Sequence, residues 1–144
     1  MIYLDSSLAV TLITAEAHTA ATQAWLVRQE PALLAVSDWV VTEVASALSL
    51  KQRTGELDDA SRQRALRTFD RLVRSSFHLL DVPRSAFHSA ADMVRRPELG
   101  VRAADALHLA VARHHDARLC TRDSRQADAG RRLGLDVLLV TALS

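Results

Sequence analysis

The sequence has few cysteines and no long apolar runs, and both facts limit the class of protein to which it can belong. Cys120 is the only cysteine among 144 residues, so no internal disulfide can form, which is typical of a reducing compartment. No apolar run is long enough to cross a membrane, and no basic start precedes an apolar segment. We therefore expect a cytoplasmic protein without a transmembrane helix or a signal peptide.

An excess of one charge is also missing, because 18 Lys and Arg residues stand against 17 Asp and Glu residues. The net charge of +1 excludes a polycation that attracts nucleic acid through its overall field, so such contacts require local basic patches. Lys51 is the only lysine. Arginine suits bidentate phosphate contacts, but a GC-rich genome produces the same bias.

What is present predicts one globular domain over residues 1–144, since 49% of the residues are hydrophobic and 24% are charged. The order of its predicted strands and helices makes it an α/β domain. Five short apolar runs are typical of buried strands: residues 2–4, 33–36, 77–82, 118–121 and 137–140. Helical patterns lie between them, at about residues 6–14, 18–28, 38–53, 59–75, 86–95, 103–112 and 124–133. This alternation predicts a parallel central sheet of about five short strands with helices on both faces.

Two aspartates come directly after predicted strands. Asp5 follows the first strand, and Asp123 follows the fourth. Ligands of open parallel sheets bind outside the carboxyl ends of the strands, so both side chains are candidates for one site. Each is equally well placed to cap the helix that follows it.

Two further carboxylates lie on apolar helix faces. Glu43 falls on the stripe formed by Val40, Val44 and Ala47. Asp105 and His108 are the only polar residues between positions 103 and 112, a pattern that indicates a buried helix. A carboxylate in such a place needs a partner, which is either another side chain, with Arg102 a candidate for Asp105, or a metal ion.

The four carboxylates together suggest a cation site. Clustered carboxylates repel one another, and a hard divalent cation keeps them ionised. Ligation by oxygen alone selects Mg²⁺ or Mn²⁺, and no Cys and His pair with zinc spacing is present. Such ions activate water in phosphodiester cleavage.

At these residues the chain resembles the PIN-domain nucleases, and in particular the VapC toxins of toxin–antitoxin pairs. The matching pieces follow the order of the family along essentially the whole chain: Tyr3-Leu4-Asp5-Ser6-Ser7, Glu43 in Thr-Glu-Val-x-x-Ala, Ala104-Asp105-Ala106-Leu107-His108-Leu109-Ala110, and Thr121-Arg122-Asp123. The Asp105 motif is the most specific of them.

The resemblance implies an endoribonuclease that depends on Mg²⁺ or Mn²⁺, a homodimer, and a cognate VapB-type antitoxin that inhibits it. It also implies that Asp5, Glu43, Asp105 and Asp123 form the acidic quartet that binds metal and carries catalysis. Asp128 is either a further acidic neighbour or a solvated helix residue.

Other polar residues near the quartet have two readings each. His108 fits proton transfer or a buried supporting role, and Ser6 and Thr121 fit contacts to the acids or ordinary capping. Arg122 and Arg125 flank Asp123 and are candidates for contacts with substrate phosphates.

Rival functions need residues that are absent or different here. A receiver domain needs a lysine at a late strand end, whereas Lys51 lies in a predicted helix. A haloacid-dehalogenase-type phosphatase needs an aspartate where Ser7 stands. The remaining alternative is a catalytically inactive PIN-fold protein that binds RNA or a partner.

Overall fold

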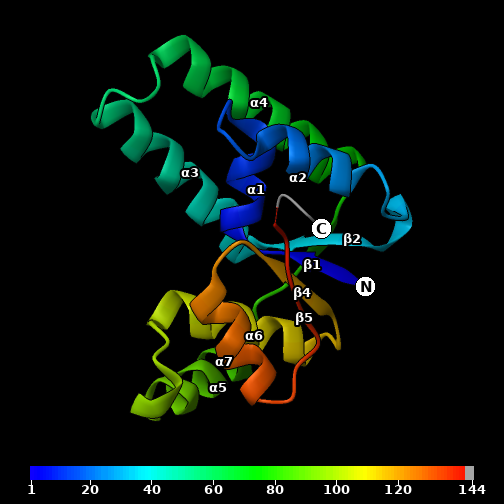
Figure 1. Ribbon diagram of the computed structural model, residues 1–144, viewed down its shortest axis with the longest axis vertical. Coiled ribbons are helices and arrows are strands. Elements are labelled where there is room, and N and C mark those ends of the chain that lie inside the picture. Colours follow the sequence, from blue (N-terminus) through cyan, green and yellow to red (C-terminus); the bar gives the residue numbers. More distant parts are fainter. Residues whose placement is uncertain (142–144) are drawn as a thin grey trace.

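The computed structural model describes residues 1–141 and contains a parallel sheet between two layers of helices (Figure 1). The strands are β1 (Ile2–Leu4), β2 (Leu34–Ser37), β3 (His78–Leu80), β4 (Arg118–Thr121) and β5 (Val137–Leu139). The helices are α1 (Ser6–Ile13), α2 (Thr19–Leu26), α3 (Asp38–Arg53), α4 (Asp59–Ser75), α5 (Arg84–Val94), α6 (Ala103–His114) and α7 (Ser124–Arg132), with short 3₁₀ helices η1 (Pro31–Leu33) and η2 (Pro97–Leu99). The predicted α/β architecture is confirmed.

The strand order places the two ends of the predicted site side by side. The order is β3-β2-β1-β4-β5, and every pairing is parallel. Helices α1 to α4 connect the first three strands on one face of the sheet, and α5 to α7 cover the other face (Figure 1). The direction of winding reverses between β1 and β4, so their carboxyl ends flank the crevice where such sheets bind ligands.

Burial of apolar residues fixes the elements that carry the site. Tyr3 and Leu4 of β1 are fully buried, and β2 is buried along its whole length. In α6 every residue from 106 to 112 is buried, as its apolar sequence predicts. Helix α3 packs with Val40 and Val44 of the predicted stripe, which have no exposed surface, whereas Ala47 is only partly buried.

Some element ends differ from the prediction. Strand β3 has three residues instead of the six expected at 77–82, because it pairs only with β2, which ends at Ser37 where α3 begins. Helix α6 continues two residues beyond position 112, to His114. Among residues 1–141, no helix combines the length and hydrophobicity needed to cross a membrane.

Candidate active site

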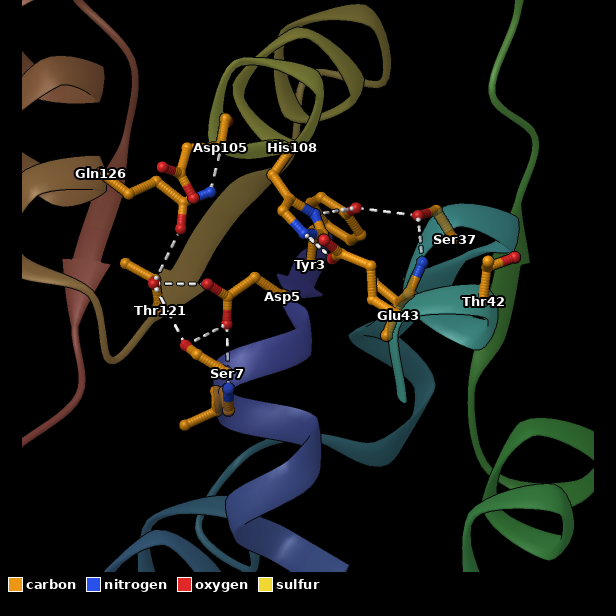
Figure 2. Close-up of polar contacts among 12 residues, drawn as sticks. Tyr3, Asp5, Ser7, Ser37, Thr42, Glu43, Asp105, His108, Thr121 and Gln126 are labelled. Carbon is orange, nitrogen blue, oxygen red and sulfur yellow. Dashed lines mark hydrogen bonds and ion pairs between the residues drawn. The ribbon is translucent and has the colours of Figure 1, made fainter. Parts of the chain in front are cut away.

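Asp5 lies at the end of β1, where it is 2% exposed and surrounded by donors. Its Oδ1 accepts hydrogen bonds from the Leu8 amide at 2.9 Å and the Ser7 hydroxyl at 2.7 Å, and its Oδ2 accepts one from the Thr121 hydroxyl. Burial raises the pKa of Asp5 above its usual value, against the opposing effect of His108 and these donors. The aspartate is therefore both a helix cap and a tie between β1 and β4 (Figure 2).

The turn after β4 is bound to the turn after β1. The Arg122 amide donates to Ser7 Oγ at 3.0 Å, and the Asp123 amide donates to Thr121 Oγ1 at 2.9 Å. The Arg122 guanidinium reaches the Val140 carbonyl at 3.3 Å. We call Asp5, Ser7, Thr121 and Arg122 the closed side of the site, because their polar groups bond to one another or to the backbone.

Asp105 and Asp123 occupy a more open region. Asp123 caps α7 through Oδ1 alone, which accepts from the amides of Arg125 at 2.8 Å and Gln126 at 3.2 Å. Asp105 is half-buried in the first turn of α6, and within residues 1–141 no ion pair joins it to an arginine. Burial, and then the negative charge of Asp123, raise the pKa of Asp105.

A pocket of about 400 Å³ connects these two carboxylates with basic residues. It is lined by Gly100, Arg102, Ala104, Asp105, Asp123, Ser124 and Arg125. We call Asp105, Asp123, Arg102 and Arg125 the open side of the site. An acidic pair beside two guanidinium groups can hold a cation and a phosphate together.

Glu43 lies on α3, where it is bound by His108 of α6, and it does not line that pocket. Glu43 Oε2 lies 2.6 Å from His108 Nε2. Burial raises the pKa of Glu43, but hydrogen bonds from His108 and Ser6 outweigh it, and the pKa lies below its usual value. Figure 2 shows the Asp5 carboxylate directed at Thr121 and Ser7, and the Glu43 carboxylate directed at His108.

Comparisons with known proteins identify the family of this chain. The model of the PIN domain family matches residues 2–132. This chain belongs to the PIN domain family. No curated protein matches it in sequence.

Solved structures share the fold of this PIN domain. VapC20 from Mycobacterium tuberculosis, described as a Sarcin-Ricin loop cleaving toxin, is 19% identical with a TM-score of 0.71, over 90% of this chain and 95% of that chain. FitAcB from Neisseria gonorrhoeae is 20% identical with a TM-score of 0.70, over 96% of both chains. VapBC2 from Rickettsia felis, bound to a DNA fragment from its promoter, is 19% identical with a TM-score of 0.70, over 96% of this chain and 98% of that chain. At these identities the likeness concerns the fold.

Of the four acids of this PIN domain, Asp105 and Asp123 line one pocket, and the four do not form a compact cluster. Among residues 1–141, no group of three Asp, Glu, His or Cys side chains lies close enough to hold one metal ion as it stands. The donors nevertheless fit a hard cation, since they are carboxylate and hydroxyl oxygens. The mutual repulsion of Asp105 and Asp123 on the open side is the feature that a cation would relieve.

The remaining sequence candidates fall into different places. Arg125 lines the pocket, whereas the side chain of Arg122 bonds to Thr22 and Val140. Asp128 is exposed, lies 3.7 Å from Arg131, and does not line the pocket of Asp105. Among the alternatives left open, the solvated reading fits Asp128.

Two residues that support the site were missed by sequence reasoning. Tyr3 and Ser37 are buried and continue the hydrogen-bonded chain from His108. The available signal was Tyr3 itself, since a tyrosine inside an apolar strand needs a partner for its hydroxyl.

Proposed function

We propose that this PIN domain is a metal-dependent endoribonuclease that acts as the toxin of a toxin–antitoxin pair. The observation that carries the proposal is the open side, where Asp105 and Asp123, which form no ion pair within residues 1–141, face a pocket that also holds Arg102 and Arg125. Family membership supports the same reading. An RNA substrate and an antitoxin would place the protein in the cytoplasm.

Asp105 and Asp123 would hold Mg²⁺ or Mn²⁺, with Asp5 and Glu43 completing the acidic surroundings. The chemistry that the ion supplies when bound is activation of a water and neutralisation of charge on the phosphate. Arg125 and Arg102 lie where a flanking phosphate would bind, since guanidinium groups match phosphate oxygens. Hydrolysis forms a bond from the water oxygen to phosphorus and breaks the bond from phosphorus to the leaving oxygen. The attacking water loses a proton, and the leaving oxygen takes one.

The antitoxin would act at the same place. A crevice that attracts cations also attracts an arginine, so we propose that a C-terminal segment of a VapB-type antitoxin binds there. A homodimer is the proposed assembly. A structure of the complex with that segment far from all four acids would contradict this mode of inhibition.

The test is cleavage of single-stranded RNA by the purified protein with Mn²⁺ or Mg²⁺, repeated in EDTA. Asp105→Asn should reduce cleavage by about 100-fold or more, because it removes one charged ligand of an ion worth several kcal/mol in the transition state. Asp92→Asn is the matched control, because Asp92 is an exposed carboxylate on α5 that pairs with Arg95. We expect it to cleave like the wild type.

Two outcomes would contradict the proposal. One is cleavage that persists in EDTA, and the other is Asp105→Asn protein with wild-type activity. A protein that binds RNA but cuts none under any of these conditions would instead be the inactive binding protein of the alternative reading. Expression in cells adds a second readout, since the wild type should arrest growth and Asp105→Asn should not.

A further inference from the structure

A buried chain of hydrogen bonds begins and ends on α3. The Val40 amide donates to Ser37 Oγ at 3.3 Å, and Ser37 Oγ lies 2.8 Å from the Tyr3 hydroxyl. The Tyr3 hydroxyl lies 2.8 Å from His108 Nδ1, and His108 Nε2 lies 2.6 Å from Glu43 Oε2. Figure 2 shows the chain passing from Ser37 of β2 through Tyr3 of β1 and His108 of α6 to Glu43 of α3.

The residues inside the chain are sealed from water. Tyr3 and Ser37 have no exposed surface, and His108 is 2% exposed. Burial raises the pKa of the Tyr3 hydroxyl, so this group stays protonated and remains a donor. Polar groups in such a place are held by their partners, since a lost hydrogen bond cannot be replaced by solvent.

The direction of the last bond does not depend on the charge of His108. An ionised carboxylate only accepts, so Nε2 must carry the proton that faces Glu43. If the ring is neutral, Nδ1 accepts from Tyr3, and Ser37 donates to Tyr3. If the ring is cationic, Nδ1 donates to Tyr3, and Tyr3 donates to Ser37. In both arrangements His108 donates to Glu43.

We propose that His108, oriented by Tyr3, is the positioning residue of Glu43 in the active site. It engages one carboxylate oxygen of a long, half-buried side chain and thereby removes rotamers that would carry the charge away from the crevice. Because Asp105 lies one turn before His108 on α6, the same bond sets Glu43 of α3 relative to Asp105. This inference rests on the proposed function.

Substitutions of His108 can separate positioning from simple packing. His108→Gln keeps an amide N–H near the position of Nε2, whereas His108→Asn is shorter and keeps a polar group only near Nδ1. His115→Asn is the matched control, because His115 follows α6 and its Nε2 donates to the Asp81 carbonyl at 3.0 Å, away from the acids. Tyr3→Phe leaves the imidazole in place and removes the hydroxyl that orients it.

The first readout is the dissociation constant of Mn²⁺ alone, measured by calorimetry on the folded proteins. His108→Asn should weaken Mn²⁺ binding about tenfold, as loss of partners behind a ligand does, and should lower kcat/KM similarly. His108→Gln should recover most of both losses. Tyr3→Phe should have an Mn²⁺ affinity between those of His108→Asn and His108→Gln. If His108→Asn does not fold, the affinity of Tyr3→Phe is the measurement that decides. His115→Asn should bind Mn²⁺ like the wild type.

The second readout is the ¹⁵N NMR signal of the His108 ring, which reports where its protons lie without any metal. We expect a protonated Nε2 whose signal shifts in Glu43→Gln. An unprotonated Nε2, or wild-type Mn²⁺ affinity in both His108→Asn and Tyr3→Phe, would overturn the positioning role while the nuclease proposal stands. A wild type that neither binds Mn²⁺ nor cleaves RNA would overturn both.

Discussion

The closed and open sides of the crevice each hold an aspartate, but the two aspartates differ in burial and in hydrogen-bond partners. On the closed side, Asp5 is almost fully buried and accepts three hydrogen bonds. On the open side, Asp105 is half-buried, has no cationic partner within residues 1–141, and is repelled by Asp123. The Asp5 carboxylate therefore connects β1 to β4 through hydrogen bonds, whereas the Asp105 carboxylate has a negative charge that no cation balances within residues 1–141.

This difference gives the two aspartates different expected roles, one in the stability of the fold and one in the proposed chemistry. Asp5 joins the ends of β1 and β4, so its loss should lower both the free energy of unfolding and the proposed activity. Asp105 is repelled by Asp123 as long as no cation is bound, so its loss should lower mainly the proposed activity. Measurements of stability can therefore distinguish the two sides where measurements of activity cannot.

The largest expected effect on stability is at the closed side. Asp5→Ala removes a helix cap and leaves buried donors without an acceptor, so we expect it to lower the free energy of unfolding by about 3 kcal/mol. Asp123→Ala removes the cap of α7 at a more open place and should cost about 1 kcal/mol. Urea denaturation in EDTA measures both, and equal losses would remove the distinction between the sides.

A metal should stabilise the protein through the open side. Mn²⁺ at about 100 times its dissociation constant should add roughly 2.7 kcal/mol to the free energy of unfolding of the wild type. Asp105→Asn should gain much less from the same concentration. Thermal melts with and without Mn²⁺ measure the difference, with Asp92→Asn as the control that should gain as much as the wild type. A wild type that gains nothing would argue against a cation site here.

The smallest expected effect is the relief of repulsion. In EDTA at neutral pH, Asp105→Asn should melt at or above the wild-type temperature, because it removes a charge that burial and Asp123 disfavour. The opposing cost is that of the asparagine amide, roughly 1–3 kcal/mol if it finds no partner. A variant several degrees less stable than the wild type would mean that Asp105 is a structural, internally paired residue.

The pH dependence gives this last prediction a sign. The folded protein binds a proton at Asp105 more tightly than the unfolded chain does, because burial and Asp123 raise the pKa of this carboxyl above its ordinary value. The contribution of Asp105 to stability therefore falls as the pH rises through the raised pKa. The stability of Asp105→Asn relative to the wild type, measured by urea denaturation, should therefore grow as the pH rises from about 4 through the raised pKa, and a difference that stays flat as the pH rises to neutral would contradict the cause.

The sequence was sufficient for the order of the elements and for the two strand-end aspartates. Apolar runs marked the strands, and the chain direction of a parallel sheet then placed Asp5 and Asp123 at one edge. From the sequence, each of these aspartates is either a helix cap or part of a functional site. Capping is confirmed for both, and the hydrogen bonds leave Asp123 Oδ2 outside its cap.

Long-range pairing was beyond sequence reasoning. Glu43 and His108 each stood out on an apolar helix face, but they are 65 positions apart, and nothing in either pattern indicated that they meet. Arg122 and Arg125 were equivalent as neighbours of Asp123, and only the turn after β4 directs the first to Val140 and the second to the pocket. The short β3 followed from the length of its partner strand.

The pairing of β1 with β4 also bears on the order of synthesis. Ile2 aligns with Arg118, so the central strand acquires its second neighbour only after more than a hundred residues have been made. Contacts of such high sequence separation form late and slow the folding of a domain. A growing chain on the ribosome therefore contains Asp5 long before the crevice between β1 and β4 exists, and the proposed activity would require that translation has passed β4.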